Sequence, residues 1–147
     1  MALDKAQASE IIDVSPENFF KVISDFESYP DFVPEVKKAK IIDRKENVLR
    51  VEYEIFMIKT IKYVLDLTLQ PPTKLTWTLA EKGFFKQNDG SWELKPLEKG
   101  KKTQATYTAD LSFGLIVPKP IITMLTSQQL PQMLKKFKAR AESLFKK

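Results

Sequence analysis

Apolar and polar residues alternate along most of the middle of the chain, which predicts a series of half-covered β-strands. The two clearest segments are 48–58 and 60–70, where charged residues such as Glu52 and Asp66 face away from the apolar side. This alternation is typical of an antiparallel sheet with one covered face. The other strands are predicted at 6–14, 36–44, 74–81, 91–97 and 103–113, with a turn region at 83–90.

The longest helical pattern runs from Ile121 to Lys147, where apolar residues recur mostly every three or four positions. Pro131 interrupts it. A proline inside a helix removes one backbone hydrogen bond and clashes with the preceding turn, so we expect a kink near Gln129–Pro131. An amphipathic helix needs an apolar partner. We therefore predict a curved sheet that grips this helix, with an apolar space between them.

Short helices are predicted between the first and second strands. Ser15 suits an N-cap, Pro16 the first helical position and Glu17 the positive end of the helix dipole. This helix should end before Pro30, and a second short helical turn is expected at 31–34. The chain shows no repeat, low-complexity segment or linker, so residues 1–147 are predicted to form a single α+β domain.

The chain contains no cysteine and no histidine. Disulfides, thiolate nucleophiles and Cys-based metal sites are therefore excluded, and the commonest general base and metal ligand is missing. We expect no metal site and no cofactor. Any enzymatic chemistry would have to use carboxylates, Tyr, Lys, Arg or Ser/Thr. No apolar run approaches the roughly 20 residues of a membrane span, and residues 1–5 lack an apolar signal core, so a cytoplasmic location is expected.

The net charge is +5, and its basic excess is concentrated in the C-terminal helical segment. Most of these side chains are expected to be ordinary solvated charges. A weak attraction of the basic helix to acidic lipid, RNA or protein stays open. The chain has no Arg-rich tract and no aromatic RNA-binding motif, so RNA is not favoured in particular and DNA is not expected as a partner.

Three stretches carry more specific information. They are Val14–Asp25 (VSPENFFKVISD), Asp25–Pro34 (DFESYPDFVP) followed by Val36, and Trp77 together with Asn88–Trp92 (NDGSW), Thr103 and Tyr107. With the order of the elements, they resemble the START-like (SRPBCC) helix-grip superfamily. The branch they resemble most is the polyketide cyclase/dehydrase and lipid-transport family, which includes coenzyme Q-binding proteins and the ribosome-association toxin type. The resemblance implies a helix-grip fold: a curved seven-stranded antiparallel sheet around a long C-terminal helix, with two short helices between strands 1 and 2.

The inward-facing residues form an apolar and aromatic wall, as ligand pockets commonly do. The alternative is that they simply fill the core; the resemblance favours a cavity between sheet and helix. The polar groups best suited to hydrogen-bond a ligand are the hydroxyls of Tyr53, Tyr63 and Tyr107, because a buried phenol needs a hydrogen-bond partner. The predicted ligand-binding residues are Tyr53, Ile55, Tyr63, Leu65, Leu67, Trp77, Leu79, Trp92, Tyr107 and Leu111 from the strands, and Leu125, Met133 and Phe137 from the helix.

Three predicted loops are unusually apolar, and exposed apolar loops often mark a partner or membrane contact. We predict that Met57, Phe84, Phe85 and Ile116 gate the cavity mouth. Lysines nearby would let the same rim touch an anionic bilayer. The alternative is that these residues fold back as core plugs.

The function that these observations favour is non-enzymatic binding and transport of a hydrophobic small molecule, with a lipid or isoprenoid quinone as the first expectation. One alternative is an enzyme of the polyketide cyclase or aromatase type, which would need an inward-pointing ionisable group. Another is a toxin-like module that binds the ribosome or a protein through the basic C-terminal helix.

Overall fold

The computed structural model describes residues 4–56, 60–81, 84–113, 120, 123 and 129–145. The helices and strands with bounds within these residues are seven strands, two α-helices and two 3-10 helices. In chain order they are β1 (Asp4–Ile12), α1 (Pro16–Ile23), η1 (Phe26–Asp31), β2 (Val36–Lys45), β3 (Val48–Phe56), β4 (Thr60–Gln70), β5 (Lys74–Leu79), β6 (Phe85–Leu97), η2 (Glu98–Gly100), β7 (Lys102–Phe113) and α3 (Leu130–Phe145).

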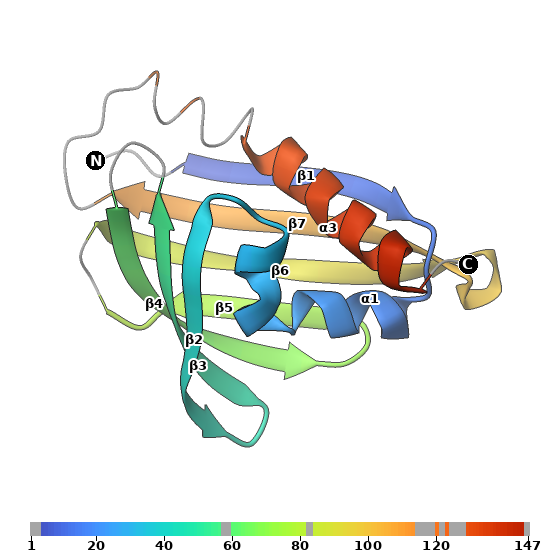
Figure 1. Cartoon of the computed structure of the whole chain (residues 1–147), viewed down its shortest axis with the longest axis horizontal. Coiled ribbons are helices and arrows are strands. Elements are labelled where there is room, and N and C mark those ends of the chain that lie inside the picture. Colours follow the sequence, from blue (N-terminus) through green and yellow to red (C-terminus); the bar gives the residue numbers. More distant parts are fainter. Residues whose placement is uncertain are drawn as a thin grey trace.

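The seven strands form one antiparallel sheet in the order β1-β7-β6-β5-β4-β3-β2. The first strand thus pairs with the last, and the remaining neighbours follow one another as a meander. Figure 1 shows the sheet bending around α3, with α1 and η1 on the same concave side. This arrangement confirms the predicted α+β helix-grip class, with two short helices between β1 and β2.

The central strands follow the alternation that their sequences predict. In β3, Leu49, Val51 and Tyr53 are buried on the concave side, while Arg50 points outward. Arg50 donates two hydrogen bonds to Asp66 of β4, at 2.8 and 3.1 Å. The β4 strand has the predicted bounds, since Pro71 and Pro72 cannot donate hydrogen bonds to continue it.

Local signals also position α1 as expected. The Ser15 side chain accepts a hydrogen bond from the Asn18 backbone N–H at 3.2 Å, and Pro16 occupies the first helical position. The helix ends earlier than predicted, at Ile23. The second short helix is η1, which lies upstream of the predicted 31–34 and contains Pro30. The Tyr29 hydroxyl donates to the Ile23 carbonyl, and this contact ties η1 to the end of α1.

The predicted long C-terminal helix is only partly covered by the described residues. Its continuous described part is α3, and residues 120 and 123 are also helical. Pro131 stands in the first turn of α3, where its missing N–H costs no helical hydrogen bond. Gln129, directly before it, is π-helical. The helical geometry therefore changes at the place where the sequence predicts an interruption.

The predicted turn region at 83–90 is wrong from residue 85 onward. Phe85 to Gly90 continue β6, where Asn88 pairs with Leu111 and Gly90 with Ala109 of β7. Cross-strand pairing has overridden the local turn preference of Asn88-Asp89-Gly90. This extension brings three further residues of β6 onto the concave face beside Trp92.

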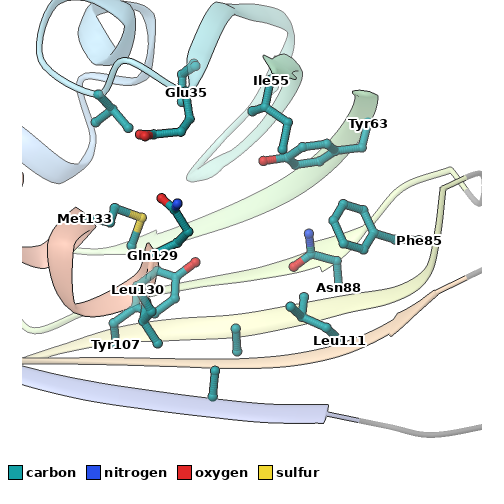
Figure 2. A pocket seen from close by; sticks show the side chains of 14 residues that line it. Glu35, Ile55, Tyr63, Phe85, Asn88, Tyr107, Leu111, Gln129, Leu130 and Met133 are labelled. Carbon is teal, nitrogen blue, oxygen red and sulfur yellow. The ribbon is translucent and has the colours of Figure 1, made fainter. Parts of the chain in front are cut away.

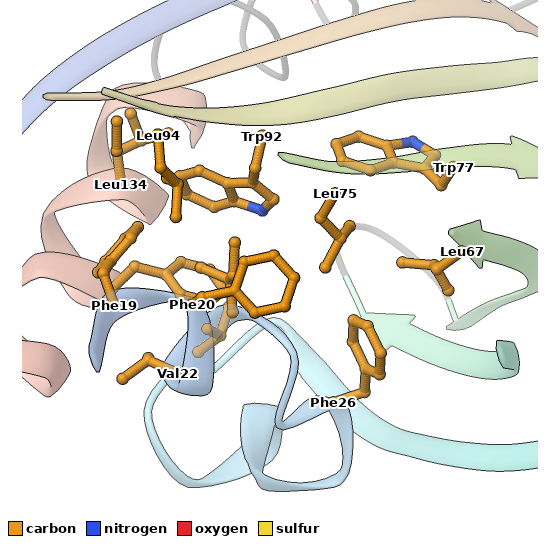
Figure 3. Close-up of a cluster of buried hydrophobic side chains, with 14 of the residues drawn as sticks. Phe19, Phe20, Val22, Phe26, Leu67, Leu75, Trp77, Trp92, Leu94 and Leu134 are labelled. Carbon is orange, nitrogen blue, oxygen red and sulfur yellow. The ribbon is translucent and has the colours of Figure 1, made fainter. Parts of the chain in front are cut away.

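The packed core fills one end of the concave face. Phe19 of α1 meets Trp92 of β6 edge-on at 5.6 Å, and Leu94 and Leu134 are buried beside them. Figure 3 shows these side chains between α1, α3 and the sheet. The helices α1 and α3 therefore cover the concave face beside Trp92 and Leu94 of β6. They leave space over that face toward the start of β6.

Candidate functional site

Two adjoining cavities lie between the sheet and α3. The outer cavity has a volume of about 190 Å³ and the inner one about 100 Å³. The outer cavity extends toward Ile55, Phe85 and Leu111 (Figure 2), whereas the inner one reaches Leu75 and Phe137. Both are lined by Val33, Val36, Tyr63, Asn88, Tyr107 and Met133.

Strand pairing groups the aromatic walls of these cavities. Tyr53 of β3 and Tyr63 of β4 are directly opposite, and their rings stack with centroids 5.2 Å apart. Tyr107 of β7 lies between two indoles, with centroids 5.1 Å from Trp77 and 5.1 Å from Trp92. Residues far apart in the chain thus meet because the inner faces of neighbouring strands coincide.

The phenol groups supply several of the few polar atoms in a mostly apolar space. Among the described residues, the hydroxyls of Tyr53, Tyr63 and Tyr107 have no hydrogen-bond partner within the protein. Burial raises the pKa of Tyr53 well above its ordinary value, and it raises the pKa of Tyr63 and Tyr107 as well. These groups therefore stay protonated at physiological pH and can donate a hydrogen bond to a ligand.

Asn88 is a cavity residue that the alternation of the predicted strands did not include. Its side chain is 7% exposed, and its Oδ1 accepts a hydrogen bond from Trp77 Nε1 at 3.1 Å. Asn88 was missed because Asn-Asp-Gly reads as a turn. Counting back from Trp92 by twos would have placed Gly90 and Asn88 on the same inner face.

One ion pair lies at the outer cavity. Glu35, just before β2, accepts a hydrogen bond from Lys136 of α3 at 3.4 Å, and both side chains are about one-third exposed. Glu35 is the only charged residue among the described residues that line either cavity. The inner cavity is lined by neutral side chains alone, so it is suited to an uncharged group.

A glycine allows the indole of Trp77 to lie directly against the backbone of β6. Trp77 pairs with Gly90, and a Cβ at Gly90 would lie 2.3 Å from the indole and 2.4 Å from the backbone oxygen of Thr108. Both separations are far inside van der Waals contact. A side chain at residue 90 would therefore have to displace the indole or separate the strands.

Gly90→Ala is accordingly expected to lower the free energy of unfolding by about 3 kcal/mol, since overpacking with no room to relax is costly. Urea denaturation followed by circular dichroism measures this loss. Ser91→Ala, the adjacent residue with its side chain on the outer face, is the matched control and should change stability little. Equal stability of the two variants would show that the indole does not need the glycine.

No group of three or more His, Cys, Asp or Glu side chains within the described part of the chain could hold a metal ion. Within the same residues, no helix is both long enough and apolar enough to cross a membrane.

The comparison with protein families agrees with this geometry. The model of the family described as "Polyketide cyclase / dehydrase and lipid transport" matches residues 12–138, which is most of the chain. The chain belongs to this family.

The chain is also similar to two curated proteins with different names. The chain is 25% identical over 142 residues to the ribosome association toxin RatA of Pseudomonas aeruginosa, covering 95% of this chain and 96% of that protein. It is 19% identical over 140 residues to the mitochondrial coenzyme Q-binding protein COQ10 homolog B of Xenopus laevis. That match covers 93% of this chain but spans only 57% of the length of the relative.

Solved structures show the same fold. A START superfamily protein from Mycobacterium smegmatis superimposes with a TM-score of 0.81 at 22% identity, covering 95% of this chain and 98% of that one. The Zhui aromatase/cyclase from Streptomyces sp. R1128 superimposes with a TM-score of 0.84 at 16% identity, covering 96% and 94%. The concave side of this fold is where the cavities of the present family member lie.

The structure brings together most of the residues predicted to bind a ligand, and their role in binding stays a prediction. Leu79 packs against the core beside the cavities without lining them, and Leu125 lies outside the described residues. The predicted residues that line one or both cavities are Tyr53, Ile55, Tyr63, Leu65, Leu67, Trp77, Trp92, Tyr107, Leu111, Met133 and Phe137.

The predicted gate is only partly described. Met57 and Ile116 lie outside the described residues. Phe85 is 7% exposed and belongs to the wall of the outer cavity, as part of β6 rather than of a loop. Phe84 is half-buried, and its ring meets that of Phe85 edge-on at 5.2 Å.

Proposed function

We propose that this family member binds and carries a neutral hydrophobic small molecule in the two cavities between sheet and α3. The observation that carries the proposal is an apolar, aromatic space with few polar groups, all but one of them uncharged. A charged ligand group in the inner cavity would lose its hydration without meeting an opposite charge. Lipids with uncharged head groups and isoprenoid quinones fit this description.

The size of the space favours a ring over a long chain. An apolar cavity of about 150 Å³ is large enough for benzene, so about 190 Å³ accommodates one ring with small substituents. The chain of a long isoprenoid quinone would then extend past Ile55, Phe85 and Leu111 at the outer end.

The charges of α3 favour this function over binding of an acidic macromolecule by a basic helix. Lys136 pairs with Glu35, Lys138 with Glu10 at 3.7 Å, and Arg140 with Asp31 at 4.0 Å. These cations hold the helix to η1, β1 and the residues before β2. The number of α3 cations available to an external partner is therefore smaller than the sequence of the helix suggests.

Acid–base catalysis has less support. The ionisable groups that line the cavities are phenols kept protonated by burial, and Glu35, which already accepts from Lys136. These observations favour a carrier over a polyketide cyclase or aromatase, the enzymatic alternative within this fold.

The first test is occupancy of the cavity. Trp77 and Trp92 are the only two tryptophans of the chain, and both line the inner cavity. A short-chain ubiquinone analogue should therefore quench the tryptophan emission in a saturable way. Native mass spectrometry should show a one-to-one complex. Absence of both signals with this analogue and with a long-chain fatty alcohol would contradict the proposal.

Ala109→Leu should block the site. Ala109 is buried in β7 and lines the outer cavity, so a larger side chain would occupy the space of the ligand. Affinity for the ubiquinone analogue is expected to fall roughly tenfold or more, since overfilling a packed site costs about 1–3 kcal/mol. Thr108→Leu is the matched control, because its side chain faces the other side of the same strand. Equal losses in both variants would place the ligand elsewhere.

A further inference from the structure

The side-chain amide of Asn88 has a fixed orientation. Its Oδ1 accepts the indole N–H of Trp77 at 3.1 Å, and both side chains are buried. An asparagine amide carries its acceptor on one side and two N–H donors on the other. Because an indole can only donate, it must meet the oxygen, and this decides which way the amide faces.

The donor side of this amide faces the cavities. Asn88 lines both of them, and Figure 2 shows its nitrogen directed toward the side of the cavity where Tyr63 lies. Within the described part of the chain, no protein group accepts a hydrogen bond from Nδ2. Asn88 is nevertheless more than nine-tenths buried. Because no fully buried side-chain nitrogen or oxygen of the described residues lacks a partner, Nδ2 is in contact with the cavity space, where water or a ligand can accept its hydrogen bond.

Trp77 itself has little freedom to turn. Its indole lies so close to Gly90 that a Cβ there would be 2.3 Å away, and the ring centroid of Tyr107 lies 5.1 Å from that of Trp77. The amide is therefore held in place before any ligand arrives. A preorganised donor lowers the cost of ordering on binding and discriminates between ligands with and without an acceptor.

We propose that Asn88, oriented by Trp77, is a specificity-determining hydrogen-bond donor for a carbonyl oxygen of the ligand. The ligand class is a neutral cyclic ketone or quinone, whose ring lies among Tyr63, Tyr107 and Met133. Trp77 acts as the positioning residue. This assignment rests on the proposed function, because it concerns the chemistry of the same cavity.

Two small probes of nearly equal shape test the assignment. Indanone and indane share one bicyclic skeleton, and only indanone has a carbonyl group. The quantity measured is the ratio of the dissociation constant of indane to that of indanone, by isothermal titration calorimetry. When this ratio is compared between variants, the part of the affinity difference that comes from the unequal hydrophobicity of the two probes cancels.

In Asn88→Leu this ratio should fall about 2- to 10-fold relative to the wild type, the range expected for one neutral hydrogen bond. The affinity for indane should fall much less or increase. Trp77→Phe keeps an aromatic ring over Gly90 but removes the indole N–H that orients the Asn88 amide. The ratio should therefore also fall relative to the wild type, while indane still binds. This second variant tests the assignment even if Asn88→Leu does not fold.

The outcomes separate the two levels of the argument. If both probes bind the wild type and neither variant changes the ratio, Asn88 is not the carbonyl donor, although the cavity binds ligands. If neither probe binds the wild type, both the proposed function and this assignment are overturned. A lower ratio in Thr108→Leu, on the outer face, would also overturn it, since the effect would not be specific to Asn88.

Discussion

Above about pH 10 the protein is expected to unfold cooperatively, with its four tyrosines ionising in the same transition. Tyr29, Tyr53, Tyr63 and Tyr107 are all the tyrosines of the chain. Burial raises the pKa of each of them above the ordinary value, which is about 10 in an unfolded chain. The folded protein therefore keeps these protons at a pH where the unfolded chain has begun to release them.

The sign of the effect follows from proton binding. Below about pH 10 both states hold the phenolic protons, and the contribution of these groups to stability is fully present. As the pH rises further, the folded state binds more protons than the unfolded one, so the free energy of unfolding falls. Each tyrosine contributes about 1.4 kcal/mol per pH unit, and the four together up to about 5 kcal/mol per pH unit.

The measurement is an alkaline titration that follows tyrosinate absorbance and far-ultraviolet circular dichroism together. The two signals should change at the same pH. Tyr53→Phe is the sharpest variant, because it removes one phenol and keeps the ring that stacks on Tyr63. The number of linked protons should then drop from about four to about three. Two or more tyrosines that titrate near pH 10 in a folded protein would contradict the burial on which the candidate site depends.

Phe137→Ala should destabilise the protein by about 3–5 kcal/mol, the usual cost of removing a fully buried aromatic ring. Phe137 is 2% exposed. Its ring packs α3 against the aromatic residues at η1 and against Trp92 of the sheet. Its ring centroid lies 5.1 Å from that of Tyr29, 5.0 Å from Phe32 and 5.2 Å from Trp92. The variant would lose these edge-on contacts and open the inner cavity toward η1.

Leu144→Ala is the matched control for this prediction. Leu144 belongs to the same helix, but its side chain is 55% exposed. Its replacement should change the free energy of unfolding by no more than about 0.5 kcal/mol. Urea denaturation of both variants gives the comparison. A loss below about 1 kcal/mol for Phe137→Ala would mean that α3 is held mainly by its ion pairs rather than by this ring.

Local sequence patterns were sufficient for most of the architecture. The period-two alternation in 48–58 and 60–70 identified the inner faces of β3 and β4, including Tyr53 and Tyr63. Ser15 and Pro16 identified the start of α1. These features are recoverable because the side chains of neighbouring residues, and the hydrogen bonds of a helix end, depend on residues only a few positions apart.

The cavity and its polar group were decided by tertiary structure. Asn88-Asp89-Gly90 has the local preference of a turn, and it became strand because β7 pairs with it along its whole length. Only then do Gly90 and Trp77 come into contact and Trp77 reach Asn88. The empty volume likewise depends on α1 and α3 filling one end of the concave face and not the other. Alternation predicts which side chains point inward, whereas the space left between them depends on how distant elements pack.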